Sequence, residues 1–183
     1  MMPLIGASAT AQLPLDPDLL NPTFCNAYWH GSPNADSRPY GIEVDTIVLH
    51  HTACDMAATL RYFSNYNSDV SAHFTVGKDG AIVQHVSPWD RAWHAGISRD
   101  AAGRKSVNDF SVGIEIENMG NGVDPYTPEQ VEAVRRLIEA VRKHFPIREI
   151  VSHASVAVPS GRKSDPRGYP WDSLADTGLT LRP

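Results

Sequence analysis

The sequence contains little cysteine, no excess of positive charge and no long apolar segment. Only 2 of its 183 residues are cysteines, and neither Cys25 nor Cys54 belongs to a Cys-x-x-Cys pair. Two cysteines are too few for a disulfide framework, so we expect free, unreactive thiols, with one bridge as the alternative. The formal net charge of −5 gives no electrostatic basis for binding nucleic acid. A run of about 18 apolar residues, which a membrane span requires, is absent.

The chain has the size and composition of one globular domain, with 42% hydrophobic and 20% charged residues. Residues 1–44 are rich in Pro, Asn, Ser and Asp and lack a sustained apolar period. We expect residues 1–31 to form an irregular N-terminal arm ahead of a domain over residues 32–183. Small residues at 7–11 resemble an export cleavage site, but a basic start and an apolar core are missing, which favours a poorly ordered leader.

Apolar periodicity predicts the secondary structure. Four segments have the β-branched or alternating apolar residues typical of strands, one of them a hairpin: 46–50, 72–86 (the hairpin), 110–118 and 148–153. A helix is predicted over 55–66, with Asp55 as its N-cap. A second helix is predicted over 127–145, where Thr127 and Gln130 form a capping box. Because strands and helices intermix, we expect a central mixed β-sheet flanked by helices, an α/β (mixed α+β) fold.

Two adjacent histidines, His50 and His51, lie at the end of the apolar run "TIVLHH", where the first predicted strand ends. Neighbouring side chains of a strand point to opposite faces, so His50 and His51 cannot both face one site. His153 ends another predicted strand, and Asp165 follows in the loop "RKSDP". Two histidines at strand ends and a loop carboxylate would form a three-ligand zinc site with the fourth position open. A strand-end histidine is also often structural, so the residue types alone leave both readings open.

Two carboxylates lie on one face of the strand "VGIEIEN". Glu115 and Glu117 alternate with apolar residues that fill the other face. They could belong to a solvated strand face, or one could be the general base that takes a proton from water beside a metal. Lys163, two residues before Asp165, could stabilise an oxyanion or be an ordinary surface lysine.

The segment "WDRAWHAG" places two tryptophans around a histidine and ends in glycine. These residue types suit a groove for a sugar ring and a peptide. By type alone they could equally be core aromatics.

Five stretches occur in the order of a known family: "IVLHHTA", "SAHFTVGKDGAIVQHV", "RAWHAG", "NDFSVGIEIEN" and "SHASVAVPSGRKSDP". Over about residues 32–174 the chain resembles the zinc-dependent N-acetylmuramoyl-L-alanine amidases related to AmpD and to peptidoglycan recognition proteins. The resemblance implies their fold, one zinc ion, and hydrolysis of the amide between N-acetylmuramic acid and L-alanine. Residues 32–183 would then be a zinc amidase catalytic domain.

The resemblance also implies a role for each matching position. It selects His50 over His51 as the ligand and Glu115 over Glu117 as the base. The complete set comprises three zinc ligands, a base, an oxyanion residue and three groove residues: His50, His153 and Asp165; Glu115; Lys163; and Trp93, His94 and Asn108.

The expected partner is peptidoglycan or a soluble muropeptide, with no nucleic acid and no membrane span, and we expect a monomer. One alternative is a non-catalytic peptidoglycan-binding module of the same fold. Another is a protein-binding domain with a structural zinc, for which Cys54 would be the fourth ligand. The connection from His50 to Ser71 is shorter than in AmpD, which favours intact wall over anhydro-muropeptide. A cytoplasmic recycling enzyme and a phage lytic enzyme that reaches the wall after release both fit the sequence.

Overall fold

The structure is a computed structural model that describes residues 24–183, so residues 1–23 of the predicted N-terminal arm (residues 1–31) lie outside the described residues. Within the described part, one sheet of seven strands forms the centre of the fold. Its order is β1 (Tyr28–Trp29), β5 (Ile82–Gln84), β4 (Phe74–Val76), β7 (Ser111–Ile116), β3 (Thr46–His51), β8 (Glu149–Ser152) and β9 (Thr180–Arg182). Neighbouring strands run parallel except β4 and β5, which form the predicted hairpin. The strands β2 (Ala35–Ser37) and β6 (Asp90–Ala92) form a separate antiparallel pair.

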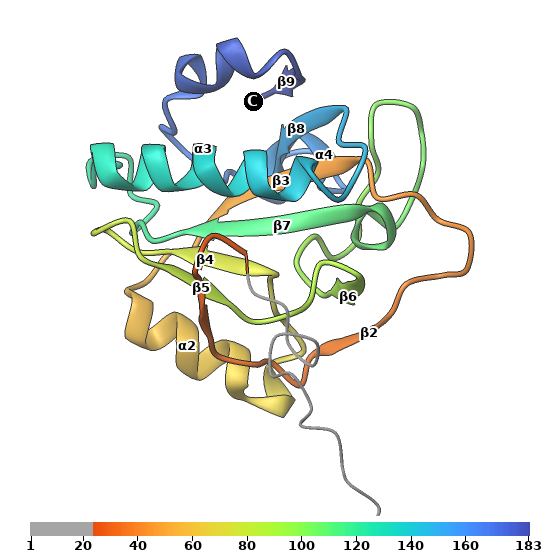
Figure 1. Cartoon of the computed structure of the whole chain (residues 1–183), viewed down its shortest axis with the longest axis horizontal. Helices are drawn as coiled ribbons and strands as arrows, with labels where there is room; N and C mark the ends of the chain where they lie inside the picture. The colour runs from red at the N-terminus through yellow and green to blue at the C-terminus, as the bar shows by residue number, and fades with distance from the viewer. Residues whose placement is uncertain (1–23) are drawn as a thin grey trace, which may run out of the picture.

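Helix α3 (Pro128–Arg142) covers one face of the sheet (Figure 1). Its start is as predicted, because the Thr127 side chain accepts from the Gln130 N–H and the Gln130 side chain accepts from the Thr127 N–H. The larger core lies between this helix and the central strands and includes Val134, Leu137, Ile138, Val141, Ile47, Leu49, Val112 and Ile114. Each such side chain contributes about 1.5–3 kcal/mol through burial. The 3₁₀ helix η3 (Trp171–Thr177) extends this core through Leu174.

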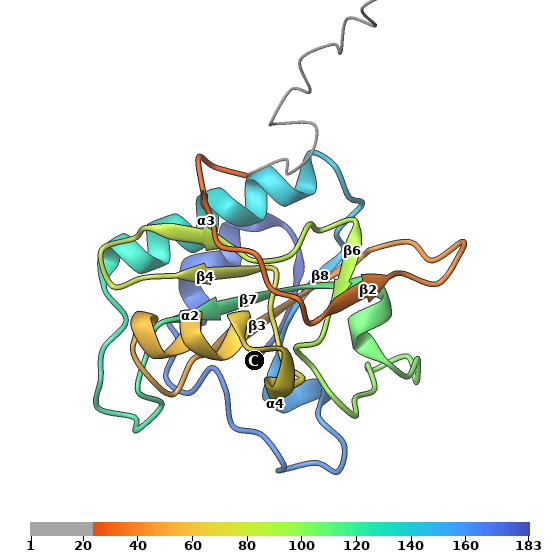
Figure 2. The same cartoon turned by 90° about the horizontal axis from the view of Figure 1, so that it is seen from below.

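Helices α2 (Met56–Ser64) and α4 (His153–Val156) lie on the side of the sheet opposite α3 (Figure 2). The Asp55 side chain caps α2 as predicted, accepting from the Ala58 N–H at 2.7 Å. Two short 3₁₀ helices, η1 (Tyr66–Ser68) and η2 (Val107–Phe110), complete the described helical segments. A smaller core on this side joins the sheet to α4 and η2 and consists of Val48, Ala95, Val107, Phe110, Val151 and Val156.

Strand alternation decides which side chains reach the α2 side. Ile47 and Leu49 pack in the core under α3, whereas Val48 belongs to the smaller core, so His50 also faces the α2 side. The predicted mixed sheet with flanking helices is confirmed. The predicted strand 148–153 extends one residue beyond each end of β8. At its carboxyl end the Ser152 hydroxyl accepts from the Ser155 N–H and begins the turn of α4 at His153. Among the described helices, none has the length and apolar character needed to cross a membrane.

Candidate active site

Three side chains from separate segments converge at the carboxyl end of the central strands. His50 lies near the end of β3, His153 starts α4, and Asp165 lies in the following loop. The Nδ1 atoms of the two histidines are 3.0 Å apart. Asp165 Oδ2 lies 3.1 Å from His50 Nδ1 and 2.9 Å from His153 Nδ1. All three residues are buried, and a hydrogen bond from the Ala154 N–H to the Asp165 carbonyl fixes the loop against α4.

The donor set fits a metal ion. In tetrahedral coordination with zinc–ligand distances of about 2.05 Å, ligand atoms are about 3.3 Å apart, close to the spacing of the three atoms found here. Among the described residues, His50, His153 and Asp165 are the one group of this kind that could hold a metal ion. Three acceptor-type atoms that face one another at this distance repel unless a cation or a proton lies between them, so the triangle suits a shared cation.

The protonation states of the group suit a metal ligand set. Burial lowers the pKa of His50 to about 4, and the neighbouring His153 adds to the shift. Burial by itself would raise the pKa of Asp165, but its polar contacts with His153 and His50 hold that pKa well below the usual range. At neutral pH, His50 is therefore neutral and Asp165 is ionised, which are the forms that bind metals.

Glu115 lies next to His50 across the sheet, because the two residues are register partners in β7 and β3. Its Oε2 is buried and has no hydrogen-bond partner among the described residues. Burial and the charge of Asp165 raise the pKa of Glu115 to about 8. A buried carboxylate with an unpaired oxygen and a raised pKa has the properties of a general base.

Glu117, the other predicted carboxylate, has a different environment. Its Oε1 accepts from the Met56 N–H and its Oε2 accepts from the Lys78 N–H, both at 3.0 Å. Both oxygens therefore support the start of α2 and the turn of the hairpin. The structure brings Glu115, and not Glu117, into the group with His50.

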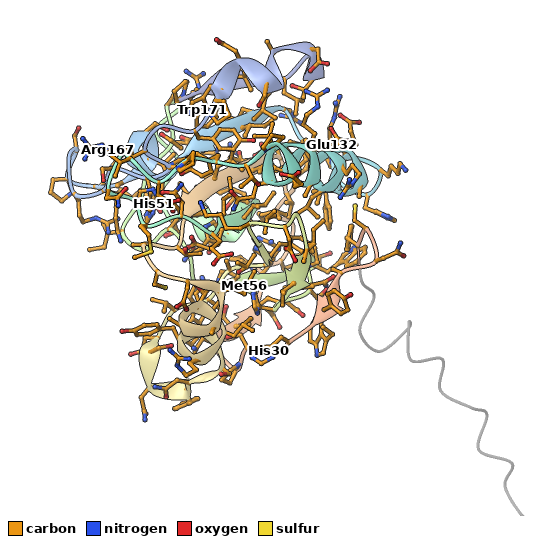
Figure 3. The ribbon with its side chains drawn as sticks, turned by 90° about the vertical axis from the view of Figure 1, so that its left-hand side faces the viewer. His30, His51, Met56, Glu132, Arg167 and Trp171 are labelled. Carbon is orange, nitrogen blue, oxygen red and sulfur yellow. The ribbon has the colours of Figure 1, made fainter. Side chains whose placement is uncertain are left out.

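His51 faces the opposite side of β3 from His50. Its Nδ1 accepts from the Arg167 N–H at 3.1 Å, and Figure 3 shows these two residues together at the end of the sheet. The His51 ring also lies so close to Gly120 that a Cβ there would be 2.4 Å from Nε2. His51 therefore packs the loop that follows Asp165.

A cavity of about 580 Å³ opens beside the three ligands. Its lining includes the predicted residues His50, His153, Asp165, Glu115, Lys163, Trp93 and His94. Lys163 is exposed at its mouth. Helix α2 forms another wall, to which Tyr62 and Phe63 contribute. Asn108 is not among the residues that line this cavity in the described chain; its Oδ1 accepts from the N–H groups of His94 and Ala95.

Sequence reasoning missed several residues of the cavity wall, among them Arg162 and Tyr62. Arg162 donates to the carbonyls of Ala95 and Ile97, which joins the loop before Asp165 to the segment that follows Trp93. Its position beside Lys163 in "GRKSDP" was the available signal. The sequence carries no signal for Tyr62 beyond its place on the predicted helix 55–66.

Cys54 also lines the cavity, but its sulfur lies 3.3 Å from the Thr59 hydroxyl and it is not part of the metal-ligand group. Both cysteines are free thiols. Three protein ligands with an adjoining cavity are typical of catalytic metal sites, whereas structural zinc sites have four protein ligands.

A mixed sheet with a two-histidine, one-aspartate group, an adjacent carboxylate and an open cavity defines a hydrolase of the metal-assisted class. The chain belongs to the N-acetylmuramoyl-L-alanine amidase family, whose sequence profile matches residues 38–168. It is therefore a hydrolase of the amide bond between N-acetylmuramic acid and L-alanine of peptidoglycan.

Individual relatives agree with this assignment. The chain is 31% identical over 159 residues to the 1,6-anhydro-N-acetylmuramyl-L-alanine amidase AmpD of Haemophilus influenzae, covering 75% of this chain and 84% of that protein. The crystal structure of a selenomethionine AmpD derivative matches with a TM-score of 0.73 and 28% identity, over 86% of this chain and 97% of that one. The AmiD amidase of E. coli, solved with the substrate anhydro-N-acetylmuramic acid-L-Ala-D-γ-Glu-L-Lys, matches with a TM-score of 0.67 and 31% identity over 78% of this chain. This chain spans 61% of the AmiD chain's length.

Proposed function

We propose that this chain hydrolyses the muramoyl–L-alanine amide with one zinc ion held by His50 Nδ1, His153 Nδ1 and Asp165 Oδ2. The observation that supports this most directly is the triangle of these three atoms, 2.9–3.1 Å apart, at the wall of an open cavity. Two imidazoles and one carboxylate are a donor set that zinc prefers. The family to which this chain belongs is zinc-dependent in general. Zinc, when bound, would lower the pKa of water from 15.7 toward about 7 and polarise the amide carbonyl.

Glu115 would take the proton of the attacking water and return it to the leaving amine of L-alanine. Its unpaired, buried Oε2 and its raised pKa support this role, because a base works best with a pKa near the working pH. A cation in the site would lower that pKa from the value for the protein alone. Glu115 lines the cavity, so its carboxylate would be within reach of a water held there.

Lys163 would stabilise the negative charge that develops on the carbonyl oxygen. It lies at the mouth of the cavity two residues before Asp165. A cation at this position would stabilise the transition state more than the bound substrate, because the negative charge that it neutralises is absent from the ground-state amide. Trp93 and Tyr62 would bound the groove for the sugar and the first residues of the stem peptide.

The form of the substrate has two supported answers. The names and titles of the relatives AmpD and AmiD refer to anhydro-muropeptides, which supports a soluble recycling substrate. The short connection from His50 to Ser71, which contains helix α2 and the 3₁₀ helix η1, favours the intact wall. We therefore treat both as arms of one experiment.

The experiment incubates the purified protein with intact sacculi and, separately, with soluble anhydro-muropeptide, each with and without a chelator. We expect new L-alanine amino termini that the chelator abolishes and zinc restores, and no new reducing ends. The substrate that is cleaved faster separates wall lysis from recycling. Binding of substrate without any release, in a protein loaded with zinc, would contradict the proposal and indicate a binding module.

A further inference from the structure

The segment His94–Ala95 contacts both histidines of the ligand group from the side opposite the metal position. His94 Nδ1 lies 3.1 Å from His50 Nε2, and the Ala95 carbonyl lies 3.1 Å from His153 Nε2. We propose that this segment positions both ligands by fixing the proton of each imidazole on Nε2, so that each Nδ1 presents its lone pair to the metal. The proposal rests on the zinc site proposed above and adds residues that do not touch the metal.

A chain of hydrogen bonds fixes the proton of His50. The Ser111 hydroxyl donates its single proton to the Val107 carbonyl at 2.6 Å. The same oxygen lies 3.2 Å from His94 Nε2, so it can only accept there, and His94 Nε2 carries the proton. His94 Nδ1 then has a lone pair and accepts from His50 Nε2. His50 Nδ1 is left without a proton, on the side of Asp165 and His153.

The reverse assignment leaves unfavourable contacts. If His94 Nδ1 donated to His50, the unprotonated His94 Nε2 would face a Ser111 oxygen whose proton is already used. Two lone pairs would then meet at 3.2 Å in a buried site, which leaves both polar groups unsatisfied. The Val107 carbonyl therefore sets the direction of the whole chain.

The proton of His153 is fixed more directly. A carbonyl oxygen has no proton to donate, so the Ala95 carbonyl must accept, and His153 Nε2 carries the proton. Arg162 donates to the same carbonyl at 3.2 Å, which holds its orientation. Hydrogen bonds of this kind to the second ring nitrogen orient metal-ligand histidines and raise their basicity.

Two features hold the segment in place. Asn108 Oδ1 accepts from the His94 N–H at 3.3 Å and from the Ala95 N–H at 2.7 Å. Gly113 in β7 gives the His94 ring room to reach His50, because a Cβ at that position would lie 2.5 Å from the ring. Both His94 nitrogens are used within the protein, so His94 would act on the ligand His50 rather than on the substrate, and Asn108 would anchor the segment.

The first test needs no metal. Imidazole ¹⁵N spectra of the metal-free protein at pH 8 should show the proton of His50, His94 and His153 on Nε2, and an unprotonated Nδ1 on His94. A proton on His94 Nδ1 would overturn the proposal. This measurement reads the hydrogen-bond chain whether or not the protein is an amidase.

The second test measures zinc affinity by competition with a chelator. We expect His94→Leu to weaken binding about 10–100-fold, and His94→Asn to restore most of it, because Asn Oδ1 can accept from His50. Ser111→Ala should also weaken binding, while Ser111→Thr keeps the hydroxyl and the affinity. His85→Leu is the matched control, since His85 is also a buried histidine but bonds to Thr75 and the His30 carbonyl.

The outcomes separate the two proposals. A wild-type protein that binds no zinc would refute the proposed function, while the nitrogen spectra would still report on the positions of the protons. A wild-type protein that binds zinc, with His94→Leu and Ser111→Ala binding it within twofold of wild type, would refute the positioning role. If His94→Leu does not fold, the zinc affinities of Ser111→Ala and Ser111→Thr test the positioning role, because these variants change only one small side chain.

Discussion

His50 and Glu115 lie side by side as register partners on the parallel strands β3 and β7, one residue before the end of each strand. The pairing places a metal-ligand candidate and a carboxylate on the same face at the same level of the sheet, because side chains in register on parallel strands point the same way. A slip of one residue would exchange His50 for His51 and bury an unpaired ring in the α3 core. The sheet register, which the apolar core fixes, therefore also fixes the geometry of the site.

Replacing Glu115 with Gln should separate metal binding from turnover. The amide has nearly the same shape but cannot accept a proton from water, so we expect a loss of about 100–10,000-fold in kcat. Zinc content should stay at one ion per chain, measured by atomic emission on the purified protein. Near-normal activity in Glu115→Gln would show that another residue is the base.

Replacing His153 with Ala should remove both properties. The variant keeps two of three ligand atoms and loses the Nδ1 that lies 2.9 Å from Asp165, so zinc affinity and amide hydrolysis should fall together. Dialysis against a chelator should have the same effect on the wild type. Added zinc should restore activity to the dialysed wild type but not to His153→Ala. A His153→Ala protein that retains its zinc would mean that the ligand set is different.

Lys163→Met should lower kcat by about 100–1000-fold with little change in zinc affinity. The methionine keeps the length of the side chain but removes the cation that would neutralise the developing oxyanion. Arg167→Met is a suitable control, because Arg167 is also exposed near this loop but does not line the cavity. Equal kinetics for Lys163→Met and the control would place the oxyanion contact elsewhere.

In the metal-free protein, the contribution of Glu115 to stability should fall as the pH rises from about 5 to about 8. The pKa of Glu115 is raised from 4.5 to about 8 in the folded protein, so in this range the folded state binds a proton that the unfolded state has released. The stabilising proton is fully present below 4.5 and is lost as the pH passes 8. Glu115→Gln lacks this dependence.

We therefore expect the metal-free wild type to melt at the same temperature as Glu115→Gln near pH 5 and at a lower one at pH 8.5. Differential scanning calorimetry of both proteins, stripped of metal, measures this difference. Zinc should reduce the difference, because its charge favours the ionised carboxylate. An offset between the two proteins that does not change with pH would show that the Glu115 pKa is not raised.

Local sequence patterns predicted most of the secondary structure. The capping box at Thr127 and Gln130 and the apolar stripe behind it predict α3, and the Asp55 cap predicts the start of α2. These signals act within a few residues, so they need no knowledge of the rest of the fold. The short helix at His153 was missed because its cap, Ser152, belongs to an apolar run that reads as strand.

Local sequence patterns predicted only part of the candidate site. Alternation along "TIVLHH" shows that His50 and His51 face opposite sides, but not which side carries the site, and Glu115 and Glu117 could not be separated by spacing. The structure separates the carboxylates because the N–H groups of Met56 and Lys78 occupy both oxygens of Glu117. Those contacts join residues 39 and 61 positions apart, and no local pattern contains them.

The sequence by itself determined the elements, the residue types and the alternation that points His50 to one face of the sheet, because these depend on neighbours along the chain. The tertiary structure alone decided that His50, His153 and Asp165 form a triangle with Glu115 next to it. It also decided that His94 and Ala95 contact the Nε2 atoms of the two histidines. The physical reason is that strand order and loop packing bring together groups up to 115 residues apart, and each of these contacts depends on the burial of the whole core.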